Sequence, residues 1–150
     1  MAYTLKSIKI HTDNSKEGMT KINEMWKDIV SGKIPLMFDS EGNFLQGLSP
    51  ISEYSNYESD ENGAYDLTVF TVTAQFFGEM ERKCKSGSYK FYDFAGDDIS
   101  EAAGKAWEQV WNDSKEGKLI RAFTNDLEST VPPEYTKDHR AHCYLYIAVK

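Results

Sequence analysis

A carboxylate beside two tyrosines is the combination in this chain with the clearest chemistry. In the last β-prone run, Tyr144 and Tyr146 alternate with an apolar row that we expect to pack under a helix. In the preceding run, Glu128 alternates with Leu127. If Leu127 faces that same helix, Glu128 shares a face with both tyrosines. Because aromatic ring faces attract cations and a carboxylate pairs with them, this arrangement predicts a cation site; a solvent-facing Glu128 is the alternative.

The elements that would position these residues occur twice along the chain. Apolar residues at spacings of three and four predict helices from Met19 to near Gly32 and from about Ile99 to Asp113. Each helix stands within the order strand, helix, strand, strand. The expected strands cover residues 3–11, 44–54, 65–73, 87–95, 121–131 and 141–150.

This repetition predicts an α+β fold with two pseudo-symmetric β-α-β-β repeats that form a mainly antiparallel sheet with a central ligand groove. We expect a single domain over residues 1–150, with repeat one at about 1–75 and repeat two at about 86–150. The charged segment 74–86 is expected to link the repeats. Trp26, on the apolar stripe of the first helix, is expected in the core.

Composition narrows the class of partner. The chain of 150 residues has a formal charge of −7, which argues against direct binding to nucleic acid. Aromatic residues make up 13% of it, which suits either a packed core or an aromatic-lined pocket. No apolar run approaches the roughly 20 residues of a membrane span, and no signal peptide is evident. Cys84 and Cys143 lack a CxxC spacing, so we expect free thiols and a cytoplasmic location.

Other site chemistries find little support in the sequence. His139, His142 and Cys143 form an H-x-x-H-C cluster, but on a strand His142 and Cys143 point to opposite faces, so no metal site is predicted. Phosphate-loop, dinucleotide and serine-hydrolase motifs are absent, and no cofactor is expected. The pair Asp97-Asp98 is better explained as a helix start than as catalytic acids.

A family resemblance rests on the order and spacing of several short motifs. These motifs are Gly87-Ser88-Tyr89, Ala106-Trp107 with Trp111, Phe123–Glu128 and Tyr144–Lys150, with Gln46-Gly47-Leu48 and Tyr65-Asp66-Leu67 in the first half. Together they resemble the GyrI-like small-molecule-binding domain, the effector-binding domain of AraC-type and MerR-type regulators. The resemblance covers nearly the whole chain. No segment remains for a DNA-binding helix-turn-helix, so it implies a stand-alone member.

The resemblance implies a groove between two repeats that takes amphipathic, often cationic, organic ligands. It places the family's groove glutamate on Glu128 and the aromatic of the final strand on Tyr146. The full set of expected ligand-binding residues is Glu128, Tyr146, Tyr144, Trp107, Tyr89, Tyr54, Tyr65 and Trp111.

Two functions of different classes follow from these residues. The first is binding of neutral-to-cationic aromatic molecules, or of a protein partner, since some relatives of the family bind DNA gyrase. The second is hydrolysis of electrophilic cyclopropane-containing genotoxins, with Glu128 as base and Tyr146 as proton donor. In either case we expect Glu128 to titrate above its unperturbed pKa of about 4.3, because burial disfavours its charge.

Overall fold

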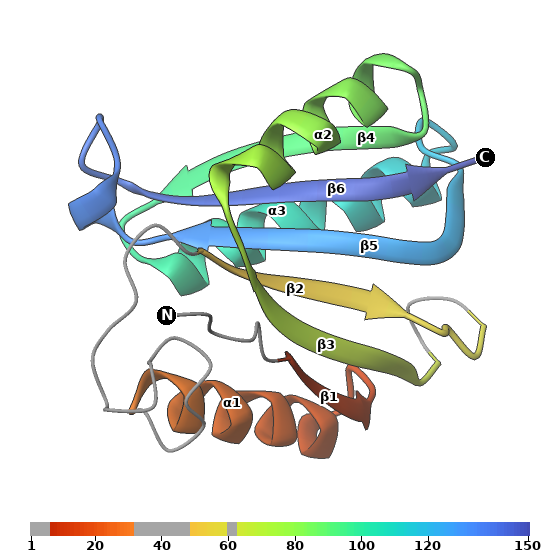
Figure 1. The fold of residues 1–150 in the computed structure, drawn as a ribbon. Helices are drawn as coiled ribbons and strands as arrows, with labels where there is room; N and C mark the ends of the chain where they lie inside the picture. Colours follow the sequence, from red (N-terminus) through yellow and green to blue (C-terminus); the bar gives the residue numbers. More distant parts are fainter. Residues whose placement is uncertain (1–6, 32–48, 60–62) are drawn as a thin grey trace. The chain divides into compact units, whose positions relative to one another are not determined.

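The computed structural model describes residues 7–31, 49–59 and 63–150 (Figure 1). The chain divides into two compact units, Met1–Phe77 and Gly78–Lys150, hereafter unit 1 and unit 2. Along the chain the elements are β1 (Ser7–Thr12), α1 (Lys16–Val30), β2 (Ser49–Ser55), β3 (Tyr65–Val72), α2 (Ala74–Lys85), β4 (Tyr89–Gly96), α3 (Ile99–Lys115), β5 (Arg121–Val131) and β6 (Ala141–Val149). A 3₁₀ turn, Pro133–Tyr135, lies between the last two strands.

Unit 1 is a three-stranded antiparallel sheet with α1 packed against it. β3 is the central strand and pairs with both β1 and β2. α1 begins at Ser15, whose hydroxyl accepts a hydrogen bond from the Gly18 amide and so satisfies one of the helix's unpaired donors. Its apolar face packs on β3 through a core of Ile22, Met25, Ile29, Tyr65, Leu67 and Val69. Trp26 packs against this core, as expected from its place on the helix stripe.

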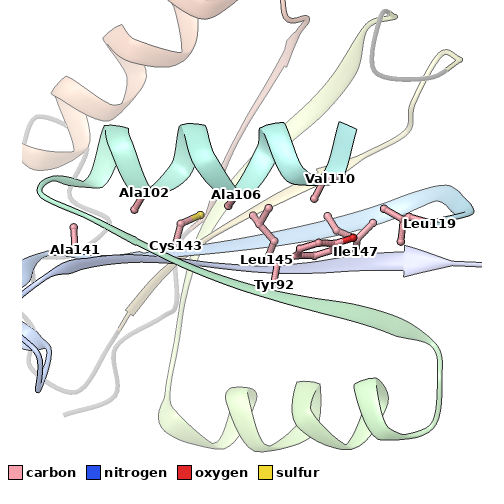
Figure 2. Packing of buried hydrophobic residues seen from close by; sticks show 9 residues of the cluster. All are labelled: Tyr92, Ala102, Ala106, Val110, Leu119, Ala141, Cys143, Leu145 and Ile147. Carbon is pink, nitrogen blue, oxygen red and sulfur yellow. The ribbon is translucent and has the colours of Figure 1, made fainter. Parts of the chain in front are cut away.

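Unit 2 repeats this order with β6 in the centre, paired antiparallel with β4 and β5. α3 begins at Asp98, whose carboxylate accepts a hydrogen bond from the Glu101 amide. Figure 2 shows the small residues of α3 lying directly on the sheet, which lets the helix come close. The buried cluster consists of Tyr92, Ala102, Ala106, Val110, Leu119, Ala141, Cys143, Leu145 and Ile147.

Both faces of the sheet in unit 2 are covered. α3 lies on one face, and α2 lies on the other side of β4 and β6 (Figure 2). On the α2 side Met80 is 2% exposed, and Tyr146 of β6 is also buried. β6 therefore buries apolar side chains on both faces, so the alternation of its residues does not by itself show which of them lie under α3.

The expected fold class is confirmed. Both β-α-β-β repeats are present, all described strand pairs are antiparallel, and Trp26 and Trp107 occupy the corresponding helices. Most of the linking segment 74–86 forms the helix α2, which the sequence did not predict. The start of the first strand, the residues 44–48 of the second and the Gln46-Gly47-Leu48 motif lie outside the described residues. The central groove and the single-domain organisation stay predictions.

Candidate functional site

Glu128 lies on the α3 side of the sheet, and the expectation that it shares a face with Tyr144 and Tyr146 is wrong. The register of β5 and β6 places Glu128 opposite Leu145, and Leu127 opposite Tyr146. Directly paired residues of antiparallel strands point to the same face. Glu128 therefore lies with the core residue Leu145 under α3, whereas Leu127 packs on the other face. The error arose because Leu127, although apolar and buried, is not on the helix side.

The Glu128 carboxylate accepts hydrogen bonds from α3 and from β6. The indole Nε1–H of Trp107, on α3, donates to Glu128 Oε2 at 2.6 Å. The thiol of Cys143, on β6, donates to the same oxygen with an S···O distance of 3.8 Å. Glu128 is half-buried. Burial and the nearby Glu128 charge raise the pKa of Cys143, so this thiol stays protonated and remains a donor.

A buried ion pair lies at the start of β5, on the same side as Glu128. Arg121 Nη2 donates to Asp126 Oδ2 at 2.7 Å, and the two side chains are 2% and 0% exposed. The second oxygen of Asp126 accepts the backbone amide of Ala148 at 2.9 Å. These bonds fasten β5 to β6 across a β-bulge between Arg121 and Asp126, where Phe123 has a φ of +55°. The bulge sets the register that turns Glu128 toward α3.

Aromatic rings surround this part of unit 2. The Arg121 guanidinium carbon lies 4.4 Å from the centroid of the Phe123 ring and 6.0 Å from that of Trp107. The rings of Trp107 and Trp111 are 6.3 Å apart and inclined by 34°, and Trp111 is 38% exposed. We call Glu128, Trp107, Trp111, Arg121 and Phe123 the glutamate–indole cluster.

The charged groups in the cluster are the carboxylate of Glu128 and the guanidinium of Arg121, and the carboxylate of Asp126 lies next to them. Arg121 and Asp126 form a buried ion pair, and the carboxylate of Glu128 accepts the indole N–H of Trp107. A half-buried carboxylate next to indole surface is suited to pair with a positively charged group while flat rings pack on the tryptophans.

Three of the expected ligand-binding residues lie on the opposite face of the sheet in unit 2. Tyr89 and Tyr144 are half-buried there, and Tyr89 donates its hydroxyl proton to Asn125 Oδ1 at 2.9 Å. Tyr146 is 7% exposed, and burial raises its pKa to about 12. Because Glu128 and Tyr146 point to opposite faces, they cannot act on one substrate as base and proton donor. The structure thus does not bring together the pair on which the hydrolase hypothesis depends.

The remaining expected residues belong to the core of unit 1. Tyr65 is 3% exposed and donates its hydroxyl proton to Asn14 Oδ1 at 2.7 Å. Tyr54 packs edge-on against it, with ring centroids 5.4 Å apart. Both rings contribute to the packing of unit 1, and a ligand-binding role for them stays a prediction.

No role in the site was predicted from the sequence for Arg121, Phe123 or Asp126. An Arg and an Asp five residues apart in a strand would point to opposite faces in regular alternation. Only the bulge brings them to the same face, and the sequence of the run carries no glycine or proline that would have revealed it.

Comparisons with known proteins give two similarities. The chain is 27% identical over 137 residues to a protein of Bacillus subtilis (strain 168) named "Putative transcriptional regulator protein YobU", and the match covers 85% of this chain and 76% of that one. Its fold is similar to the crystal structure of the integron cassette protein VCH_CASS2, from the mobile metagenome of Vibrio cholerae. That match has a TM-score of 0.61 and 18% identity, and it covers 98% of this chain and 95% of the other. No family model matches the chain.

The structural match shows a shared fold, and neither printed name states a ligand. In the parts of the chain that the structure describes, no group of three or more His, Cys, Asp or Glu side chains is arranged to hold a metal ion. Within the same residues, no helix is long and apolar enough to cross a membrane.

Proposed function

We propose that this protein binds small, planar, amphipathic molecules of neutral to positive charge, with the glutamate–indole cluster of unit 2 as the binding site. The observation that carries the proposal is the 2.6 Å hydrogen bond from Trp107 to the half-buried carboxylate of Glu128. This bond fixes the carboxylate at the edge of an indole ring, so one ligand can stack on the ring and pair with the charge.

Three further observations support the proposal. The whole chain carries a formal charge of −7, so its field favours the approach of cations over anions. Trp111 presents a partly exposed ring next to Trp107, which adds apolar contact area. A regulator-type relative and the resemblance to GyrI-like domains both fit a protein that recognises a small effector.

The proposal is tested by replacing the carboxylate with its neutral amide. We expect Glu128→Gln to weaken binding of the planar cation proflavine at this site by about tenfold or more, equivalent to roughly 1.4 kcal/mol. The neutral dye coumarin should bind both proteins within about twofold, because its binding depends on ring contacts. Affinities can be measured by fluorescence titration, with the mass of each dye checked afterwards to detect any chemical conversion.

A matched control is Glu108→Gln, which removes the same charge from an exposed position on α3. It should leave proflavine affinity within about twofold of the wild-type value at moderate salt. Equal weakening by the two substitutions would show a general charge effect, and unchanged affinity in Glu128→Gln would remove Glu128 from the site. A change in dye mass produced by wild type alone would instead support a hydrolase.

A further inference from the structure

A row of aromatic rings crosses the α2 side of β4 and β6, opposite the glutamate–indole cluster. His142 and Tyr144 have ring centroids 5.6 Å apart and planes inclined by only 14°. Tyr144 and Phe91 continue the row at 6.0 Å and 15°. Phe91 is also 5.3 Å from Tyr146, and it is 43% exposed. Three nearly parallel, offset rings form a surface on which a further flat ring can stack.

A pocket of about 450 Å³ lies at the His142 end of this row. Its volume falls within the range of roughly 300–1,000 Å³ that small-molecule sites occupy. Val131, His142 and Tyr144 belong to the strands β5 and β6, and Thr136, Lys137 and Asp138 belong to the connection between them. We call these six residues the outer pocket.

The connection that borders the outer pocket is held in place. The hydroxyl of Thr136 donates to the carbonyl oxygen of Arg140 at 2.7 Å, and the Arg140 amide donates to Asp138 Oδ1 at 3.1 Å. His142 ties the same connection to the sheet, because its Nε2 is 2.8 Å from Asp138 Oδ2. The pocket is therefore bordered by a constrained turn, so the turn itself loses less conformational entropy when a ligand binds.

The charges around the outer pocket favour a cation over an anion. His142 lies between two carboxylates, with Nδ1 2.8 Å from Asp93 and Nε2 2.8 Å from Asp138. A protonated His142 and the two carboxylates still sum to one negative charge. Burial, followed by the charges of Asp93 and Asp138, raises the pKa of Tyr144. Lys137 is exposed, so its ammonium group can turn toward solvent.

His142 is not a free base in this arrangement. Both ring nitrogens are occupied by carboxylates, so the imidazole serves as a fixed ring of the row rather than as a proton acceptor for a substrate. The chemistry that remains is stacking and charge pairing.

We propose that the outer pocket is a second binding site, which takes a planar aromatic cation in contact with the rings of His142 and Tyr144 and paired with the carboxylate of Asp138. This site is separate from the glutamate–indole cluster because the two lie on opposite faces of the sheet in unit 2. It does not depend on the function proposed for Glu128, and each site has its own reporter residues.

The three histidines of the chain provide a direct test by proton NMR. Proflavine added to the full-length protein should shift the ring protons of His142 in a saturable manner, through the ring current of the stacked dye. His11, paired with Asp66 in unit 1, should not move. His142 signals that stay in place at saturating dye would overturn the proposal.

Two substitutions probe the contacts separately. Tyr144→Leu removes the stacking ring, and Asp138→Asn removes one charge from an exposed residue with little change in shape. Each should weaken the affinity read from His142 by about fivefold or more, whereas Glu128→Gln should leave it within about twofold. Circular dichroism checks that each variant folds. If Tyr144→Leu does not fold, the affinity of Asp138→Asn tests the proposal by itself. An unchanged His142-derived affinity in Asp138→Asn, or tighter binding of the anion naphthalene-2-sulfonate, would contradict the proposal.

Discussion

At the scale of single residues, the partners of the Glu128 carboxylate are set by the face of β5 on which the side chain lies. Its carboxylate accepts hydrogen bonds from an indole and from a buried thiol, two weakly hydrated groups. Of the aromatic residues that the sequence analysis expected beside Glu128, Trp107 contacts it, whereas Tyr144 and Tyr146 lie on the other face of the sheet. Alternation separates the two faces of a strand, but it cannot say which face meets the helix when both are buried.

The two cysteines should differ in reactivity because their thiols differ in burial. Cys143 is fully buried, and burial together with the Glu128 charge raises the pKa of its thiol, whereas Cys84 is half-buried on α2. Burial and Glu81 also raise the pKa of Cys84, so its reaction should be slow. Because the thiolate is the reactive form, we expect Ellman's reagent at about pH 8 to modify one thiol in the native protein and two after unfolding.

The control for this assignment is Cys84→Ser. The variant should show almost no native reaction and one thiol after denaturation. Rapid native labelling of Cys143 in that variant would mean that the region around Glu128 opens to solvent.

At the scale of elements, the sequence predicted the order of strands and helices well and their orientation less well. Alternation and the spacing of apolar residues located the bounds of β5 to the residue and those of α3 and β6 within two residues. α2 was missed because its many charges suggested an exposed link, although Phe76, Met80 and Cys84 recur every four residues along it. The β5 bulge was missed because no residue type in that run requires it.

The ion pair at the bulge should be a major source of stability. Asp126→Ala removes the carboxylate to which the buried Arg121 donates at 2.7 Å, and it removes the acceptor of the Ala148 amide. We therefore expect the free energy of unfolding in urea to fall by about 3–5 kcal/mol. Asp126→Asn, which retains an acceptor for the amide, should lose less.

A surface ion pair supplies the comparison. Glu81 pairs with Lys85 one turn along α2, and both side chains are more than two-thirds exposed. Glu81→Ala should change the free energy of unfolding by less than about 1 kcal/mol. Similar losses for Asp126→Ala and Glu81→Ala would show that the bulge contributes little.

At the scale of the whole molecule, unit 2 carries two chemically different surfaces on one sheet. The α3 side presents a carboxylate with indoles, and the α2 side presents tyrosines, Phe91 and a histidine between two carboxylates. The overall negative charge attracts cations to both. Salt should weaken this attraction over distances beyond about 10 Å and spare the direct pairs.

Stability should also depend on pH through His142. Hydrogen bonds to Asp93 and then Asp138 raise its pKa in the folded protein. The stabilisation is therefore complete below about pH 6.5, the unperturbed value, and is lost as the pH rises through the raised pKa. The melting temperature of wild type should exceed that of His142→Gln most at about pH 6, and the difference should shrink toward pH 9. A difference that is constant or grows with pH would contradict this assignment.

The central claim is that Glu128 and Trp107 together bind a planar cation, and the indole N–H signal of Trp107 tests it most directly. The chain has three tryptophans, so three such signals are expected in a ¹⁵N-labelled sample. Proflavine should shift the Trp107 signal in a saturable manner in wild type and leave Trp26, in the core of unit 1, unmoved. In Glu128→Gln the same shift should require about tenfold more dye. A Trp107 signal that does not respond to saturating proflavine, or that responds equally in Glu128→Gln, would contradict the account.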